Sequence, residues 1–78
     1  MTTLTTALNT TFTPAAGAFI VQCTGGNAQL ERRGSSSASW AIVGVVANGL
    51  TSNIDNPVAA ADYRFTGLSG TPSVQADQ

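Results

Sequence analysis

Very few side chains of this 78-residue chain could take part in chemistry, and their spacing pairs none of them for catalysis. The chain has no histidine and no lysine, which removes the usual general base and amine chemistry. Its four acidic residues are Glu31, Asp55, Asp62 and Asp77. Glu31 and Asp62 could form a glycosidase pair across two strands, but so short a chain leaves little room for a substrate cleft. The sequence therefore predicts a protein that is not an enzyme.

The single cysteine and the glycine pair have simpler structural interpretations. Cys23 lies on the same face of the expected strand as Phe19 and Val21. We therefore expect a small buried side chain, with an intermolecular disulfide as the alternative. One cysteine without histidine cannot supply a zinc site, and we expect no metal or cofactor. Gly25-Gly26 lacks the lysine and helix start of a phosphate-binding loop. We expect it to form a hairpin turn instead.

Charge is scarce, at 9% of residues with a net charge of −1. The only cations are Arg32, Arg33 and Arg64, too few for the electrostatic footprint of a nucleic-acid-binding protein. These arginines have two interpretations: Glu31 pairs with Arg64 across strands, or the arginines contact a neighbouring subunit.

The most apolar run, residues 38–50, is too short for a membrane span, and no secretion signal is expected.

The chain is small enough that its core is expected to need support. Only 20 residues are Val, Ile, Leu, Met, Phe, Trp or Tyr. A core of this size supplies about 3–5 kcal/mol, and neither a disulfide nor a metal is available to add to it. Association with copies of itself or with a larger assembly is therefore expected.

Residues 1–16 form a separate compositional block, in which seven positions are threonine. Because β-branched residues favour extended chain, we expect an extended N-terminal arm or an edge strand, with Leu4, Leu8 and Phe12 as its apolar anchors at a protein interface. Removal of residues 1–13 should then leave the rest folded.

Residues 17–78 are expected to form a β-domain, because apolar and polar residues alternate between frequent turn signals. The resulting fold class is all-β, a small antiparallel β-sandwich or barrel of five to seven short strands with the extended N-terminal arm. Both faces of the strand at 39–47 should be covered, and Asn48-Gly49 should turn the chain into the next strand. The expected strands are 17–24, 27–33, 39–47, 50–54 and 62–68, with a turn at 69–72 and an edge strand at 73–76.

The aromatic residues leave a binding role open. Trp40 shares a strand phase with Ile42 and Val46, which favours a place in the core. The alternative is an exposed sugar-binding platform that uses Trp40 or Tyr63.

The order of features between Gly17 and Phe65 resembles small virion proteins of tailed bacteriophages. The resemblance rests on FIVQCTGGNAQLERR, a Ser/Gly loop, SWAIVGVV with its lone tryptophan, and NPVAAADYRF. It implies a capsid decoration or cement protein, made in the host cytoplasm, that binds the major capsid protein on the outer surface of the head. It also implies a homo-oligomer, most commonly a trimer. Arg32, Arg33 and Arg64 would then lie at subunit contacts, and the alternative is a receptor- or glycan-binding module of a phage tail or fibre.

Overall fold

Two long strands form the frame of the fold. The computed structural model describes residues 1–78 and contains one antiparallel sheet of five strands. The order β1-β5-β2-β3 runs across this sheet, and β4 also pairs with β2. The all-β antiparallel fold expected from the sequence is therefore confirmed. The strands are β1 (Thr3–Thr5), β2 (Phe19–Arg33), β3 (Ala41–Val46), β4 (Thr51–Ile54) and β5 (Asp62–Asp77).

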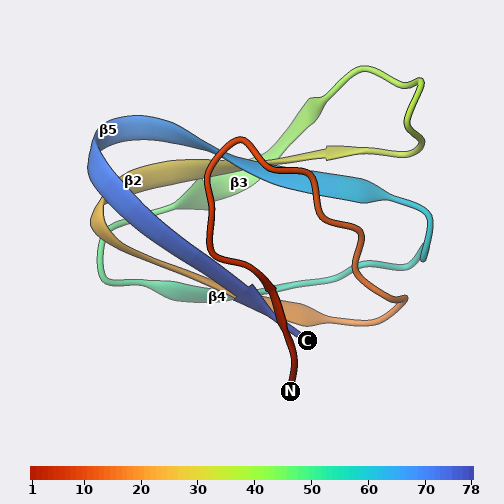
Figure 1. Ribbon diagram of the computed structural model, residues 1–78, viewed down its shortest axis with the longest axis horizontal. Helices are drawn as coiled ribbons and strands as arrows, with labels where there is room; N and C mark the ends of the chain where they lie inside the picture. The colour runs from red at the N-terminus through yellow and green to blue at the C-terminus, as the bar shows by residue number, and fades with distance from the viewer.

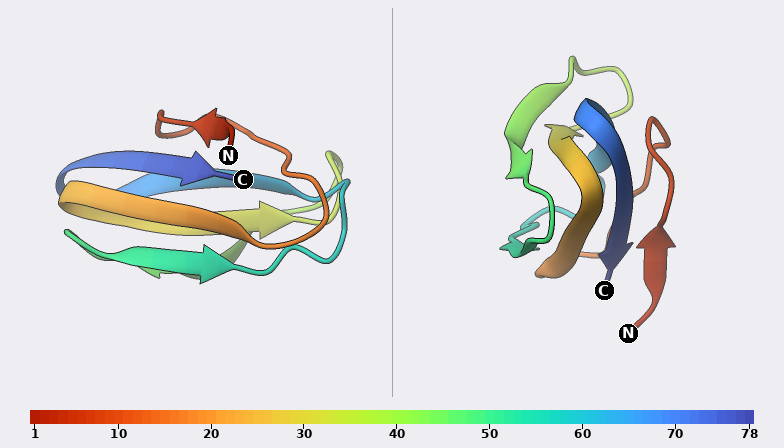
Figure 2. Two further views of the ribbon diagram at one scale, coloured as in Figure 1. Left: turned by 90° about the horizontal axis from the view of Figure 1, so that it is seen from below. Right: turned by 90° about the vertical axis from the view of Figure 1, so that its left-hand side faces the viewer.

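The sheet is folded over on itself to make two layers (Figure 1). Strands β2 and β5 pair from Ile20↔Asp77 to Arg33↔Asp62 and bend sharply together near their middles. In one layer β3 pairs with the second half of β2, and in the other β4 pairs with its first half. Seen from the side, β1, β5 and β2 follow one another across the molecule, and β3 and β4 both lie beyond β2 (Figure 2). The core lies between the two layers.

The expected hairpin turn at Gly25-Gly26 is wrong. Both glycines lie inside β2, and Gly25 has a φ of 80°. A Cβ on Gly26 would collide with backbone atoms of Ser69, Thr71 and Pro72 on β5. The register shifts here, so the glycines allow two paired strands to bend at close approach, as β-bulges do.

The turn expected at residues 69–72 is wrong for the same reason. These residues lie inside β5, where Gly70 has a φ of 66° and faces Gly26. Asn48-Gly49 does turn the chain, and Leu50 N donates to Ala47 O at 3.0 Å. The turn connects the two layers, because β3 and β4 each pair with β2 and not with one another.

The N-terminal segment packs on the β-domain, and its residues 3–5 form an edge strand, which was the alternative to an extended arm. Strand β1 pairs with the end of β5, and the backbone of Phe12 exchanges hydrogen bonds of 2.8 and 2.9 Å with Tyr63. The Phe12 ring stacks on Tyr63 and Phe65 and meets Phe19 edge-on, with ring centroids 5.8–5.9 Å apart. The segment crosses in front of the two layers (Figure 1) and closes that side of the core. The core residues are Phe12, Phe19, Val21, Cys23, Ala28, Leu30, Val46, Ala61, Tyr63, Phe65, Val74 and Ala76.

A buried polar contact fastens the same segment. Asn56 is fully buried, and its side-chain amide donates to the carbonyl oxygens of Pro14 and Ala15. The Tyr63 hydroxyl donates to Asn56 Oδ1 at 3.1 Å, and no buried side-chain polar atom lacks a partner. The accessible surface is 4122 Å², close to the ~4,400 Å² expected of a monomer of this mass. The chain thus encloses its core by itself.

Candidate docking surface

The apolar residues expected to anchor the arm on a partner contact the chain's own core. Leu4 and Leu8 are half-buried and pack against the core cluster. Phe12 lies within that cluster and is 6% exposed, so it has almost no surface to offer a partner. The N-terminal segment crosses in front of the two layers and covers this side of the core (Figure 1). Of these three anchors, Leu4 and Leu8 keep exposed surface, and their interface role stays a prediction.

Two of the three arginines form ion pairs within the chain. Arg64 Nε lies 2.8 Å from Glu31 Oε1, and Arg33 Nε lies 3.0 Å from Asp62 Oδ2. In both pairs the two residues face one another in the register of β2 and β5. The expected pairing of Glu31 with Arg64 is therefore confirmed. Cross-strand pairs of this kind hold the register and leave less charge free for a neighbouring subunit.

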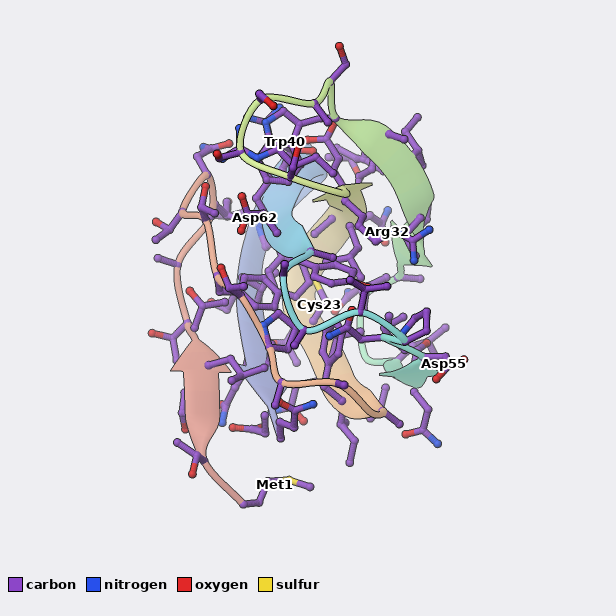
Figure 3. All side chains as sticks on the ribbon, turned by 90° about the vertical axis from the view of Figure 1, so that its right-hand side faces the viewer. Met1, Cys23, Arg32, Trp40, Asp55 and Asp62 are labelled. Atoms are coloured by element: carbon purple, nitrogen blue, oxygen red, sulfur yellow. The ribbon has the colours of Figure 1, made fainter.

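Trp40 lies outside the core, contrary to the expectation from its strand phase. The guanidinium carbons of Arg33 and Arg64 are 4.4 and 4.3 Å from the centre of its ring. The register with β2 shifts between Leu30 and Glu31, so Ile42 is exposed while Val46 is buried, and the strand phase that would place Trp40 in the core is broken within β3. Cation–π contact with both arginines fixes the end of the loop at residues 34–40 on the outer face of the sheet. Trp40 is labelled above Asp62 in Figure 3.

Asp62 connects the paired strands to the N-terminal segment. Its Oδ1 accepts a hydrogen bond of 2.8 Å from Thr13 Oγ1, and its Oδ2 accepts one from Arg33. These two contacts, with the hydrogen bond from Thr13 first, lower the pKa of the Asp62 carboxyl below its ordinary value. Both oxygens of the carboxylate therefore accept hydrogen bonds within the chain, which gives Asp62 a structural role.

The groups that could perform covalent or metal chemistry are enclosed or dispersed. Cys23 is 1% exposed, its thiol donates to Gly26 O at 3.2 Å, and burial raises its pKa. A buried thiol cannot reach a second chain, which removes the intermolecular disulfide from the folded state. No three cysteine or carboxylate side chains gather where a metal ion could be held. The fold contains no helix, and hence none that could cross a membrane.

Strand β3 carries the largest group of exposed apolar side chains within one element, whereas Leu50, Val58 and Leu68 are exposed singly. Ile42, Val43 and Val45 are 66%, 40% and 58% exposed, so the expectation that both faces of this strand are covered is wrong. Strand β3 pairs with β2 along one edge, and no strand pairs with its other edge. Natural edge strands are usually protected by charge, proline or short length. Strand β3 has no charge and no proline, whereas β1 has three residues and β4 is mostly polar.

A cavity of about 370 Å³ lies at the start of β3. Its volume falls within the range of small ligand sites. Arg32 is the one arginine without an ion pair, and no acidic residue lines the cavity. Figure 3 looks at this end of the molecule and shows Arg32 well apart from Asp55, on the segment that follows β4. The lining residues are Arg32, Arg33, Gly34, Ser39, Ala41, Asn56, Pro57 and Val58.

Neither the edge nor the cavity was identifiable from the sequence. The run AIVGVV indicates a strand, but only the pairing of β2 with β5 shows that this strand is left at the edge. Arg32 was expected at an interface, which stays a prediction, while the residues across the cavity lie more than twenty positions away in the chain.

Comparison of the chain with family models, with curated proteins and with solved structures finds no match in any of the three.

Proposed function

We propose that this chain is a non-enzymatic structural protein of a bacteriophage virion, a decoration or cement protein that binds the outer surface of the assembled head. The observation that carries the proposal is the uncharged, apolar free edge of β3, where three large apolar side chains in one strand are exposed. An exposed apolar edge strand promotes aggregation of a free protein, but it can serve as a binding surface in a protein that is permanently part of an assembly. The scarcity of charge supports the same conclusion.

The mechanism is linkage between binding and assembly. A protein that binds the closed shell, but not its open or dissociated subunits, stabilises the shell by mass action. Many copies on one particle add many small contributions, so each contact with the major capsid protein can be weak. Such a protein needs a rigid, compact fold and a docking surface, and it needs no reactive group.

The test uses phage particles that lack the chain because its gene has been deleted. Purified full-length protein is added to heads and, separately, to tails, and binding is measured by co-sedimentation. Saturable binding to heads, with a raised temperature of genome release, is the expected result. Binding to tails alone would replace the decoration role with a tail role, and binding to neither would end the proposal.

The oligomeric state is tested in the same preparation by light scattering over a range of concentrations. A trimer is the assembly that the proposal expects. Because the chain encloses its own core, a folded monomer is also stable in principle, and its appearance would mean that copies meet only on the particle.

A receptor- or glycan-binding module of a tail or fibre is the second candidate, and the position of Trp40 favours it. Trp40 lies outside the core against Arg33 and Arg64, whereas Tyr63 is 0% exposed and cannot contact a ligand. Aromatic rings on a surface are common sugar contacts. A saturable change in tryptophan emission on addition of host-surface polysaccharide would support this candidate, and an unchanged spectrum would count against it.

A further inference from the structure

We propose that the free edge of β3 and the cavity beside it form one site, which binds an extended apolar segment of a partner protein with an acidic side chain at its end. The segment would add a strand next to β3 and place its carboxylate on Arg32. This inference deepens the proposed function and rests on it for the identity of the partner.

The backbone of β3 supplies the first part of the site. A strand that pairs on one side only presents its remaining N–H and C=O groups to an incoming strand, and main-chain hydrogen bonds then provide affinity. The exposed side chains of Ile42, Val43 and Val45 give that incoming strand apolar contacts. A Cβ on Gly44 would meet no atom within 4 Å, so the middle of the strand is open to close approach.

Arg32 supplies the second part of the site. The residue faces Ala41, the first residue of β3, in the register of the sheet, and both line the cavity. Arg33 and Arg64 are neutralised by Asp62 and Glu31, which leaves Arg32 as the free cation of a chain without lysine. A planar guanidinium that makes no ion pair within the chain is suited to a carboxylate of a partner.

Antiparallel pairing, which every strand pair of this sheet uses, gives the segment its direction. An antiparallel strand beside β3 ends where β3 begins, so its last residues reach Ala41 and the cavity. We therefore expect the acidic residue at the C-terminal end of the bound segment. Apolar residues should alternate along the segment on the face opposite to the acidic side chain, because Ile42 and Val45 pair with Glu31 and Gln29, and these lie on the face of β2 opposite to Arg32.

A second copy of this chain fits the site less well. Antiparallel pairing of β3 with another β3 would bring the residues after Val46 to the cavity, and these are Ala47, Asn48 and Gly49. None of them carries a negative charge, so Arg32 would stay unpaired in both copies. The free charge of Arg32 therefore favours a different, acidic partner.

The test uses the full-length, isotope-labelled protein and two synthetic peptides. The first is acetyl-VTVTVTVEG-amide, in which Glu lies on the face opposite to the valines, and the second carries Gln in place of Glu. Backbone amide shifts are followed during titration. We expect shifts that concentrate in residues 41–46 with both peptides, and an affinity at least fivefold higher for the peptide with Glu.

Three variants assign the effect to the two parts of the site. Arg32→Gln should equalise the two peptides without abolishing the shifts, and Val43→Lys should weaken both. Asn53→Lys places the same charge on the exposed edge strand β4 and should change neither. The amide spectrum of each variant shows whether it is folded.

Several results would overturn the inference. No shift in β3, shifts elsewhere, or equal affinity for both peptides in the unmodified protein would each do so. A doubled solution mass that returns to a monomer in Val43→Lys would show that a second copy fills the edge, which also overturns it. Binding to phage heads without peptide binding would leave the proposed function standing alone, whereas peptide binding without head binding would leave only this site.

Discussion

Gly26 of β2 and Ser69 of β5 approach so closely that a single methyl group does not fit between them. A Cβ on Gly26 would collide with the carbonyl oxygen of Ser69, and it would lie 2.9 Å from Thr71 N. Both neighbours are backbone atoms and cannot rotate away. The bend that folds one sheet into two layers therefore depends on a hydrogen atom at this position.

Substitution of Gly26 by alanine should destabilise the fold severely. Forcing a methyl group into a packed position costs ~1–3 kcal/mol, and a domain of this size has only ~3–5 kcal/mol in total. Urea unfolding measures the loss. Gly34→Ala is the matched control, because a Cβ there meets no atom within 4 Å, and a similar loss in both variants would refute the packing argument.

Stability should fall in acid as Asp62 is protonated. Its pKa is lowered in the folded state by Thr13 and Arg33, so its contribution is fully present above the unfolded-state pKa, near 4. That contribution is lost as the pH falls through the lower, folded pKa. Chemical unfolding between pH 7 and pH 2 measures the slope.

Asp62→Asn should flatten this acid slope, because asparagine cannot bind the proton. The variant should also be less stable than the unmodified protein at pH 7, where it leaves Arg33 without its partner. Asp55→Asn is the control, since Asp55 makes no ion pair. An unchanged slope in Asp62→Asn would show that other carboxylates govern acid unfolding.

The sequence predicted the parts of the fold that depend on neighbouring residues. The alternation of Phe19, Val21 and Cys23 on one side of β2, and of Tyr63 and Phe65 in β5, marks strands with a buried face. The Glu31–Arg64 pair also follows from strand phase and opposite charge. These features need only local periodicity and the chemistry of one side-chain pair.

The parts that were missed depend on pairing between distant segments. Gly25-Gly26 has the composition of a hairpin turn, and only the presence of β5 alongside decides for a bend within one strand. Phe12 belongs to the core because the folded sheet leaves its front uncovered, which no local pattern shows. The exposure of Ile42 and Val45 likewise follows from the order of strands in the sheet.

Cys23 should resist thiol reagents in the folded protein. The sulfur is buried, its pKa is raised by burial, and only the thiolate reacts quickly. The rate with a disulfide reagent at pH 8 should be suppressed by orders of magnitude, and it should rise to that of a free thiol in denaturing urea. Fast modification without denaturant would show that the bend near Gly26 opens readily.

Truncation of the N-terminal segment should unfold the domain, in contrast to what a free arm would do. Phe12 fills the front of the core between Phe19, Tyr63 and Phe65, and loss of a buried phenylalanine side chain costs ~3–5 kcal/mol. That cost is comparable to the whole stability of so small a domain. Deletion of residues 1–13, or Phe12→Ala alone, should therefore abolish the cooperative thermal transition seen by circular dichroism.

Thr11→Ala, at an exposed neighbouring position, should keep the transition within a few degrees of the unmodified protein. A truncated chain that still unfolds cooperatively would mean that the two layers close without Phe12, and that residues 1–13 are free to contact a partner.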